Sequence, residues 1–146
     1  MTTSSSGGPS TSPATPTDPP LGRILLVDDD FTVATIITRQ LGLAGFHVAP
    51  HTASETAIGA FADDPRAFDL AILDRFIPSI SGGRLAFLLW QLEPDLPIVF
   101  ISGAIDELKL TRQPGPHVRL AKPFRDVELL GAVRSLLGLP SNATRA

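Results

Sequence analysis

Between residues 21 and 139, short apolar runs rich in β-branched residues alternate with longer segments of helical period. The apolar runs predict five strands: RILLV (23–27), FHVA (46–49), DLAIL (69–73), PIVFI (97–101) and VRLA (118–121). The segments that follow them predict helices over approximately 31–44, 53–63, 83–93, 105–112 and 125–138. This alternation is typical of an α/β fold with a doubly wound parallel sheet, for which the common five-strand order is 2-1-3-4-5.

The length of 146 residues suits one globular domain with a sizeable core. Residues 1–20 are almost entirely Ser, Thr, Pro and Gly, a composition that predicts a disordered leader. The alternative is a segment that binds a partner or regulates the domain. We expect the domain to span residues 21–139 and residues 140–146 to form a short tail. In the third helix, the helical spacing of Phe87, Leu88 and Trp90 predicts core packing.

Composition narrows the class of partner and the cellular setting. Lys and Arg number 12 against 15 Asp and Glu, so the net charge of −3 gives no general electrostatic reason to bind nucleic acid. Cysteine is absent, which excludes disulfides and thiolate metal sites and favours a reducing compartment. No apolar segment is long enough to span a membrane, and no export signal is visible. We therefore expect a cytoplasmic protein that binds neither nucleic acid nor membrane.

Unusual polar residues follow four of the predicted strands. Asp28 and Asp29 follow the first strand, Asp74 the third, Ser102 the fourth and Lys122 the fifth. Ligands bind at this carboxyl edge in open α/β sheets. The order 2-1-3-4-5 places the first and third strands side by side, so the three aspartates should converge.

Three converging carboxylates repel one another and need a counter-ion. Hard oxygen ligands with room for water suit Mg²⁺ better than Zn²⁺. Asp30, the next residue along, is better placed to cap the first helix.

These motifs resemble a known family over residues 21–139. The segments VDDD, LDRFIPSISG (with Asp74, Pro78 and Gly82), ISGA and AKPF resemble the receiver domain of two-component response regulators, which has a flavodoxin-like fold. Because seven residues follow Leu139, the resemblance is to the stand-alone, single-domain type. Such a receiver acts through contacts with a downstream protein that the sequence does not identify, or passes its phosphoryl group onward in a phosphorelay.

The resemblance implies a role for each polar residue. Asp74 would accept a phosphoryl group from a histidine kinase or a histidine phosphotransfer protein. Asp28, Asp29, Asp74 and the carbonyl of Phe76 would bind Mg²⁺, with Asp29 a direct ligand and Asp28 an outer one. Ser102 and Lys122 would contact the phosphoryl oxygens. Such a protein is no enzyme toward outside substrates, because it catalyses only its own phosphorylation and dephosphorylation. The resemblance also implies a cis bond between Lys122 and Pro123.

Two features depart from the family pattern. Arg119 stands at the switch position, where the family commonly has an aromatic residue, and a charged guanidinium on a strand should reach solvent or pair with a carboxylate. The segment between Ser102 and Lys122 is short and interrupted by the sequence PGP (114–116). Choice of partner on that side of the domain therefore cannot be inferred from the resemblance.

Two alternatives come from other functional classes. A degenerate receiver would serve as a docking module without taking phosphate. DDDFT also fits the DxDxT motif of haloacid dehalogenase-like phosphatases, with Ser102 and Lys122 in the place of later motifs. That second reading leaves Asp74 unexplained and lacks an acidic pair after Lys122.

Overall fold

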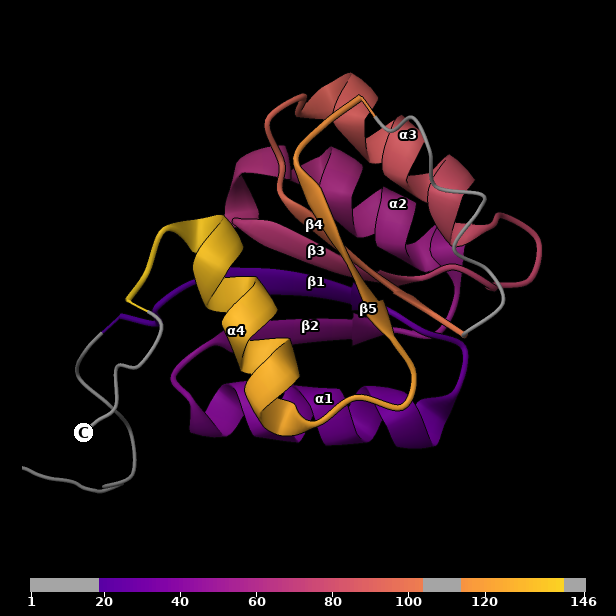
Figure 1. Cartoon of the computed structure of the whole chain (residues 1–146). Helices are drawn as coiled ribbons and strands as arrows, with labels where there is room; N and C mark the ends of the chain where they lie inside the picture. Colours follow the sequence, from indigo (N-terminus) through magenta and orange to yellow (C-terminus); the bar gives the residue numbers. More distant parts are fainter. Residues whose placement is uncertain (1–18, 104–113, 141–146) are drawn as a thin grey trace, which may run out of the picture.

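The computed structural model describes residues 19–103 and 114–140, and five parallel strands form the centre of the described fold (Figure 1). The sheet order is β2-β1-β3-β4-β5, as the sequence predicts. The strands are β1 (Arg23–Val27), β2 (His47–His51), β3 (Leu70–Asp74), β4 (Ile98–Ser102) and β5 (His117–Ala121). All observed strand bounds lie within one residue of the predictions, except that β2 ends two residues later.

Four described helices pack on the two faces of the sheet (Figure 1). Helices α1 (Phe31–Leu43) and α4 (Asp126–Leu137) cover one face, and α2 (Ser54–Asp63) and α3 (Gly82–Leu92) cover the other. A short 3₁₀ turn, η2 (Pro65–Ala67), follows α2. The helix predicted over 105–112 lies outside the described residues. No described helix is long and apolar enough to cross a membrane.

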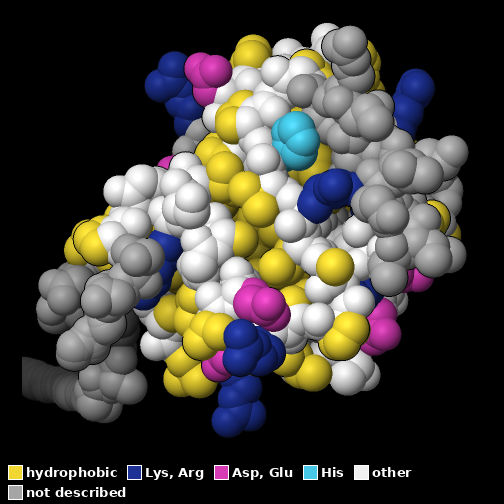
Figure 2. Space-filling model, in the orientation of Figure 1, with side chains coloured by type: hydrophobic (Ala, Val, Ile, Leu, Met, Phe, Trp, Pro, Cys, Tyr) yellow, Lys and Arg dark blue, Asp and Glu magenta, His cyan; other side chains and the backbone are white. Residues whose placement is uncertain are grey.

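The core consists of two apolar layers, one on each face of the sheet. Strands β3 and β4 are buried along their whole length, whereas the edge strands β2 and β5 are half-exposed. This burial on both faces explains why the central strands are continuous apolar runs instead of alternating ones. Hydrophobic side chains also remain visible at the surface between α4 and β5 (Figure 2). The described helices therefore leave part of that face of the sheet uncovered in this view.

Local signals at the helix ends match the observed boundaries. Asp30 caps α1, because its side chain accepts hydrogen bonds from the amides of Thr32 and Val33. Gly45 has a φ of +105° just after α1, a conformation that favours glycine.

The prediction of core packing in α3 is right for Trp90, which is buried, and wrong for Phe87, which is 47% exposed. The buried positions of α3 recur every three or four residues through Trp90, and Phe87 lies between them on the outer face.

Candidate functional site

The carboxyl edge of the sheet brings together the polar residues that the sequence singles out. The parallel hydrogen-bond ladders continue one residue beyond the strands at this edge. The amide of Asp28 donates to the carbonyl of His51 (3.0 Å), and the amide of Lys122 donates to the carbonyl of Ser102 (2.8 Å). Asp74 is the last residue of β3 and pairs with Ile101 of β4. The sheet itself therefore fixes the backbone at each of these positions.

Three carboxylates converge at this edge, as the strand order predicts. Each of Asp28, Asp29 and Asp74 offers an oxygen atom, and these atoms lie within 4.8 Å of one another. Asp28 and Asp74 are buried, whereas Asp29 is exposed. One oxygen of Asp28 accepts a hydrogen bond from the amide of Asp30 at 2.9 Å. Its other oxygen, Oδ2, is buried without a hydrogen-bond donor in the described part of the chain.

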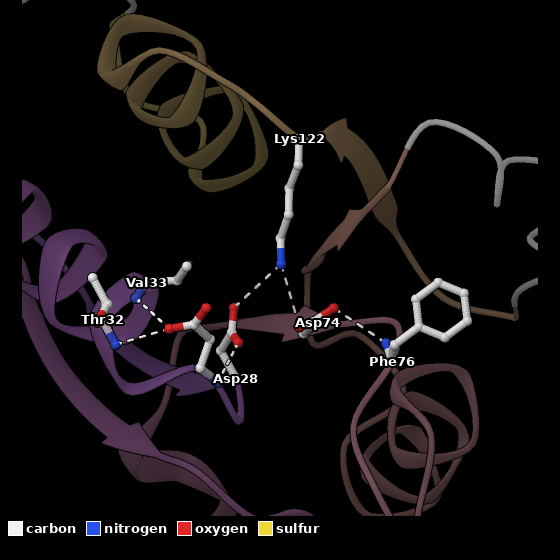
Figure 3. Close-up of polar contacts among 7 residues, drawn as sticks. Asp28, Thr32, Val33, Asp74, Phe76 and Lys122 are labelled. Carbon is white, nitrogen blue, oxygen red and sulfur yellow. Dashed lines mark hydrogen bonds and ion pairs between the residues drawn. The ribbon is translucent and has the colours of Figure 1, made fainter.

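Lys122 lies between the two buried carboxylates (Figure 3). Its Nζ is 3.4 Å from Oδ2 of Asp74 and 3.9 Å from Oδ2 of Asp28. The side chain of Lys122 is 33% exposed, whereas that of Asp74 is 7% exposed. The bond between Lys122 and Pro123 is cis, as expected from the resemblance. Within residues 19–103 and 114–140, Lys122 thus pairs with Asp28 and Asp74, two of the three clustered carboxylates.

The burial and the neighbouring charges change the pKa of Asp28. Its pKa is raised from 3.8 to about 6, chiefly because burial removes water from the carboxylate. The Asp30 amide lowers the pKa, the negative charge of Asp74 raises it, and the ammonium group of Lys122 lowers it. The backbone donor and Lys122 thus offset only part of the combined effect of desolvation and Asp74 on the pKa of Asp28.

The donor set fits a hard divalent cation. The three side chains offer only oxygen ligands, and Oδ2 of Asp28 is a buried acceptor without a hydrogen bond. Mg²⁺ binds through one or two carboxylates and retains several waters, which suits a cluster whose third carboxylate is exposed. The fourth predicted ligand, the carbonyl of Phe76, belongs to a residue whose amide donates to Oδ1 of Asp74 at 3.1 Å. The ring of Phe76 is 63% exposed and points away from Asp74 (Figure 3).

Ser102 and Arg119 complete the set of predicted residues. Ser102 is the last residue of β4, is buried, and pairs with Ala121 of β5. It therefore lies at the same edge as Asp74, while its contact with a phosphoryl group stays a prediction. Arg119 is exposed on β5 and pairs with Phe100. The expectation that its side chain reaches solvent is confirmed, and its effect on switching stays a prediction.

Two residues that shape the segment after Asp74, Ser54 and Glu55, carry no signal in the sequence, and Gly82 is identified there by its spacing only. Ser54 and Glu55, in the first turn of α2, contact the segment that joins β3 to α3. Gly82 starts α3 so close to β3 that an added Cβ would lie 2.0 Å from the carbonyl oxygen of Asp74. A serine followed by glutamate near a helix start reads as ordinary capping, so the sequence carries no distinct signal for the contacts of Ser54 and Glu55.

Known proteins resemble both the sequence and the fold. The chain is 30% identical over 117 residues to the response regulator receiver protein CpdR of Brucella abortus, covering 79% of this chain and 96% of CpdR. It is 32% identical to the transcriptional regulatory protein PrrA of Mycobacterium tuberculosis, covering 79% of this chain and 49% of PrrA. The chain thus spans about half of PrrA, and it spans 20% of the two-component response regulator ARR10 of Arabidopsis thaliana.

Solved structures agree with these relatives. A response regulator receiver protein from Sinorhizobium medicae superposes with a TM-score of 0.70 at 28% identity, covering 80% of this chain and 94% of that one. A receiver domain protein from Clostridium thermocellum shares the fold with a TM-score of 0.75 at 21% identity, covering 81% and 95%. The family model for the response regulator receiver domain matches residues 24–134. With the five-stranded order, the clustered aspartates and the lysine that faces them, this match means that the chain belongs to the response regulator receiver domain family.

Proposed function

We propose that this protein is a phospho-accepting receiver in which Asp74 takes a phosphoryl group from a histidine kinase or a histidine phosphotransfer protein. The observation that carries the proposal is the convergence of three carboxylates with Lys122 at one edge of the sheet. Asp28, Asp29, Asp74 and the Phe76 carbonyl would hold Mg²⁺. When bound, the ion would neutralise charge on the carboxylates and on the oxygens of the incoming group.

In this reaction an oxygen of Asp74 attacks the phosphorus of the donor's phosphohistidine. The new P–O bond forms as the P–N bond breaks, and the released imidazole nitrogen takes up a proton from water. The amide of Phe76 holds Oδ1 of Asp74 at 3.1 Å, which limits rotation of the carboxylate. The ammonium group of Lys122, 3.4 Å from the other oxygen, is placed to stabilise negative charge on the transferred group.

The response to phosphorylation would begin at Ser102, whose hydroxyl can donate a hydrogen bond to an oxygen of the new phosphoryl group. Ser102 ends β4, and Gly103 separates it from the segment 104–113, which lies outside the described residues. The resulting change would be read through contacts with a downstream protein or lead to onward transfer in a phosphorelay. On this proposal the protein is a signalling component of the cytoplasm and not an enzyme for outside substrates.

The surface beside Lys122 supports a protein as the phosphoryl donor. A groove of about 530 Å³ runs between α1 and the segment after β5. Ile36 on its wall is 50% exposed and adds apolar surface to the groove. The groove is lined by Val33, Ile36, Ile37, Gln40, Lys122, Pro123 and Phe124. A donor with an apolar helical surface could pack here while its histidine approaches Asp74.

Both alternatives remain distinguishable from this proposal. The dehalogenase-like reading requires Asp30 as a catalytic residue, but Asp30 is engaged in capping α1 through the amides of Thr32 and Val33. The docking-module reading differs in one measurable property, because such a protein would not take up phosphate. No observation of the carboxylate cluster favours it over a phosphorylated receiver.

The deciding experiment incubates the intact protein with acetyl phosphate and Mg²⁺ and measures its mass. We expect one phosphoryl group to be added to the wild type and none to the Asp74→Asn variant. Asp95→Asn is the matched control, because Asp95 is an exposed aspartate before β4, at the opposite edge of the sheet. A wild-type protein that gains no phosphoryl mass would support the docking module instead.

A further inference from the structure

The segment 75–81, which joins β3 to α3, is held from the side by the first turn of α2. The hydroxyl of Ser54 donates to the carbonyl of Ile80 at 2.8 Å, and Ser54 is fully buried. Glu55 accepts a hydrogen bond from the hydroxyl of Ser79. Two consecutive residues of the helix therefore bind two consecutive residues of the segment, and we call this pair of contacts the α2 clamp.

The backbone conformation that the clamp holds is one that the segment would not adopt readily by itself. Ser79 has a φ of +72°, which is unfavourable for a residue with a Cβ. Such a conformation persists when the surrounding contacts determine it from several sides. Here Ile77 is buried in the core, the amide of Gly82 donates to the carbonyl of Arg75 at 3.1 Å, and the clamp adds two side-chain hydrogen bonds.

The hydroxyl of Ser54 does not cap α2. The N-cap residue of α2 is Ala53, which makes no side-chain cap hydrogen bond, and the hydroxyl of Ser54 is directed to Ile80 instead. The local hydroxyl contact of this turn comes from Thr56, which donates to the carbonyl of Ala53 at 3.1 Å. The buried hydroxyl of Ser54 thus binds a residue 26 positions later in the sequence, in the segment that follows Asp74.

We infer that Ser54 and Glu55 are positioning residues for Asp74. The clamp acts at one end of segment 75–81, while the other end carries the Phe76 amide that binds Oδ1 of Asp74. With the clamp released, the segment gains backbone freedom, the Phe76 amide leaves Asp74 more often, and the carboxylate loses its orientation for in-line attack. The step to the phosphorylation rate rests on the proposed function, whereas the step to the Phe76 amide does not.

The first measurement is hydrogen exchange of the Phe76 amide, followed by NMR in the metal-free protein. A hydrogen bond of this kind contributes about 0.5–1.5 kcal/mol, so Ser54→Ala should raise the exchange rate roughly twofold to tenfold. Glu55→Ala should act in the same direction. Glu55→Gln retains an acceptor oxygen for Ser79 and should rescue most of the protection. Thr56→Ala is the matched control, since it removes a hydroxyl from the same turn without touching segment 75–81.

The second measurement is phosphorylation by acetyl phosphate. Ser54→Ala should lower the maximal rate roughly twofold to tenfold while leaving the half-saturating concentration of acetyl phosphate unchanged. The inference is overturned if Phe76 exchange in Ser54→Ala matches the wild type, or if Thr56→Ala raises it equally. It is also overturned if a phosphorylatable wild type and Ser54→Ala react at the same maximal rate. If the wild type takes no phosphoryl group, the proposed function fails and the exchange result alone decides the clamp.

Discussion

Replacing Asp28 with asparagine should make the metal-free protein more stable at neutral pH. Asp28 is fully buried, and its pKa rises from 3.8 to about 6, mainly through desolvation. At 1.36 kcal/mol per pH unit, this difference corresponds to roughly 3 kcal/mol of destabilisation once the carboxyl is ionised in both states. Asparagine is close in size, keeps an oxygen that can accept from the Asp30 amide, and carries no charge.

The direction in which stability changes with pH follows from the number of protons that each state binds. Between pH 3.8 and about 6 the unfolded chain has lost the Asp28 proton while the folded protein retains it. The folded state therefore binds more protons, and the contribution of Asp28 to the free energy of unfolding falls as the pH rises. This contribution is complete below pH 3.8 and is lost above about 6. The stability of Asp28→Asn relative to the wild type should thus increase by roughly 2 to 3 kcal/mol between pH 4 and pH 7.

The assay is urea unfolding in the presence of a chelator, followed by the fluorescence of Trp90, the only tryptophan and a buried one. The quantity to compare is the difference between variant and wild type, because other groups also titrate. Burial lowers the pKa of His51, so that residue removes stability as the pH falls, opposite to Asp28. This effect is common to both proteins and cancels in the difference. A difference that stays constant from pH 4 to pH 7 would refute the reasoning.

Three further outcomes follow from the site. Asp29→Asn should weaken Mg²⁺ binding more than Asp28→Asn if Asp29 is the direct ligand, and equal affinities in a calorimetric titration would contradict that assignment. Gly82→Ala should destabilise the protein by about 1–3 kcal/mol or more in the same urea assay, because the added Cβ would lie 2.0 Å from the carbonyl oxygen of Asp74. Arg119→Ala should leave phosphorylation largely intact, whereas Ser102→Ala should permit it but blunt the conformational response. NMR shifts with and without beryllofluoride test this contrast, and equal suppression by both variants would contradict it.

The fold could be predicted because its signals are local and repeated. The apolar runs that become β1, β3 and β4 are buried on both faces, so they contain few interruptions and read clearly as parallel strands. The cap at Asp30 and the positive φ at Gly45 are also properties of single positions. The outward orientation of Phe87 was harder, because a helix rich in apolar residues has several faces that resemble a core face.

The sequence predicts which residues of the site lie close together. It does not predict the contacts that hold them in position. Carboxyl-end placement and strand order suffice to bring Asp28, Asp29 and Asp74 together. The contact of Ser54 with Ile80 joins residues 26 apart and depends on how α2 lies against the segment after β3. No periodicity or composition encodes that arrangement. Such contacts emerge only from the packed structure, as does the 2.0 Å approach that explains Gly82.

Burial and negative charge oppose each other at this edge of the sheet. The apolar strands β1 and β3 carry Asp28 and Asp74 into a buried position, and the buried cluster has Lys122 as its cation among the described residues. The burial that forms the core is therefore also the reason why ionised Asp28 destabilises the folded protein. A divalent ion bound only by the folded state would offset it, adding about 2.7 kcal/mol at 100 times its dissociation constant. Added Mg²⁺ should consequently stabilise the wild type more than Asp28→Asn at pH 7, and equal stabilisation of both would mean that Asp28 contributes nothing to holding the ion.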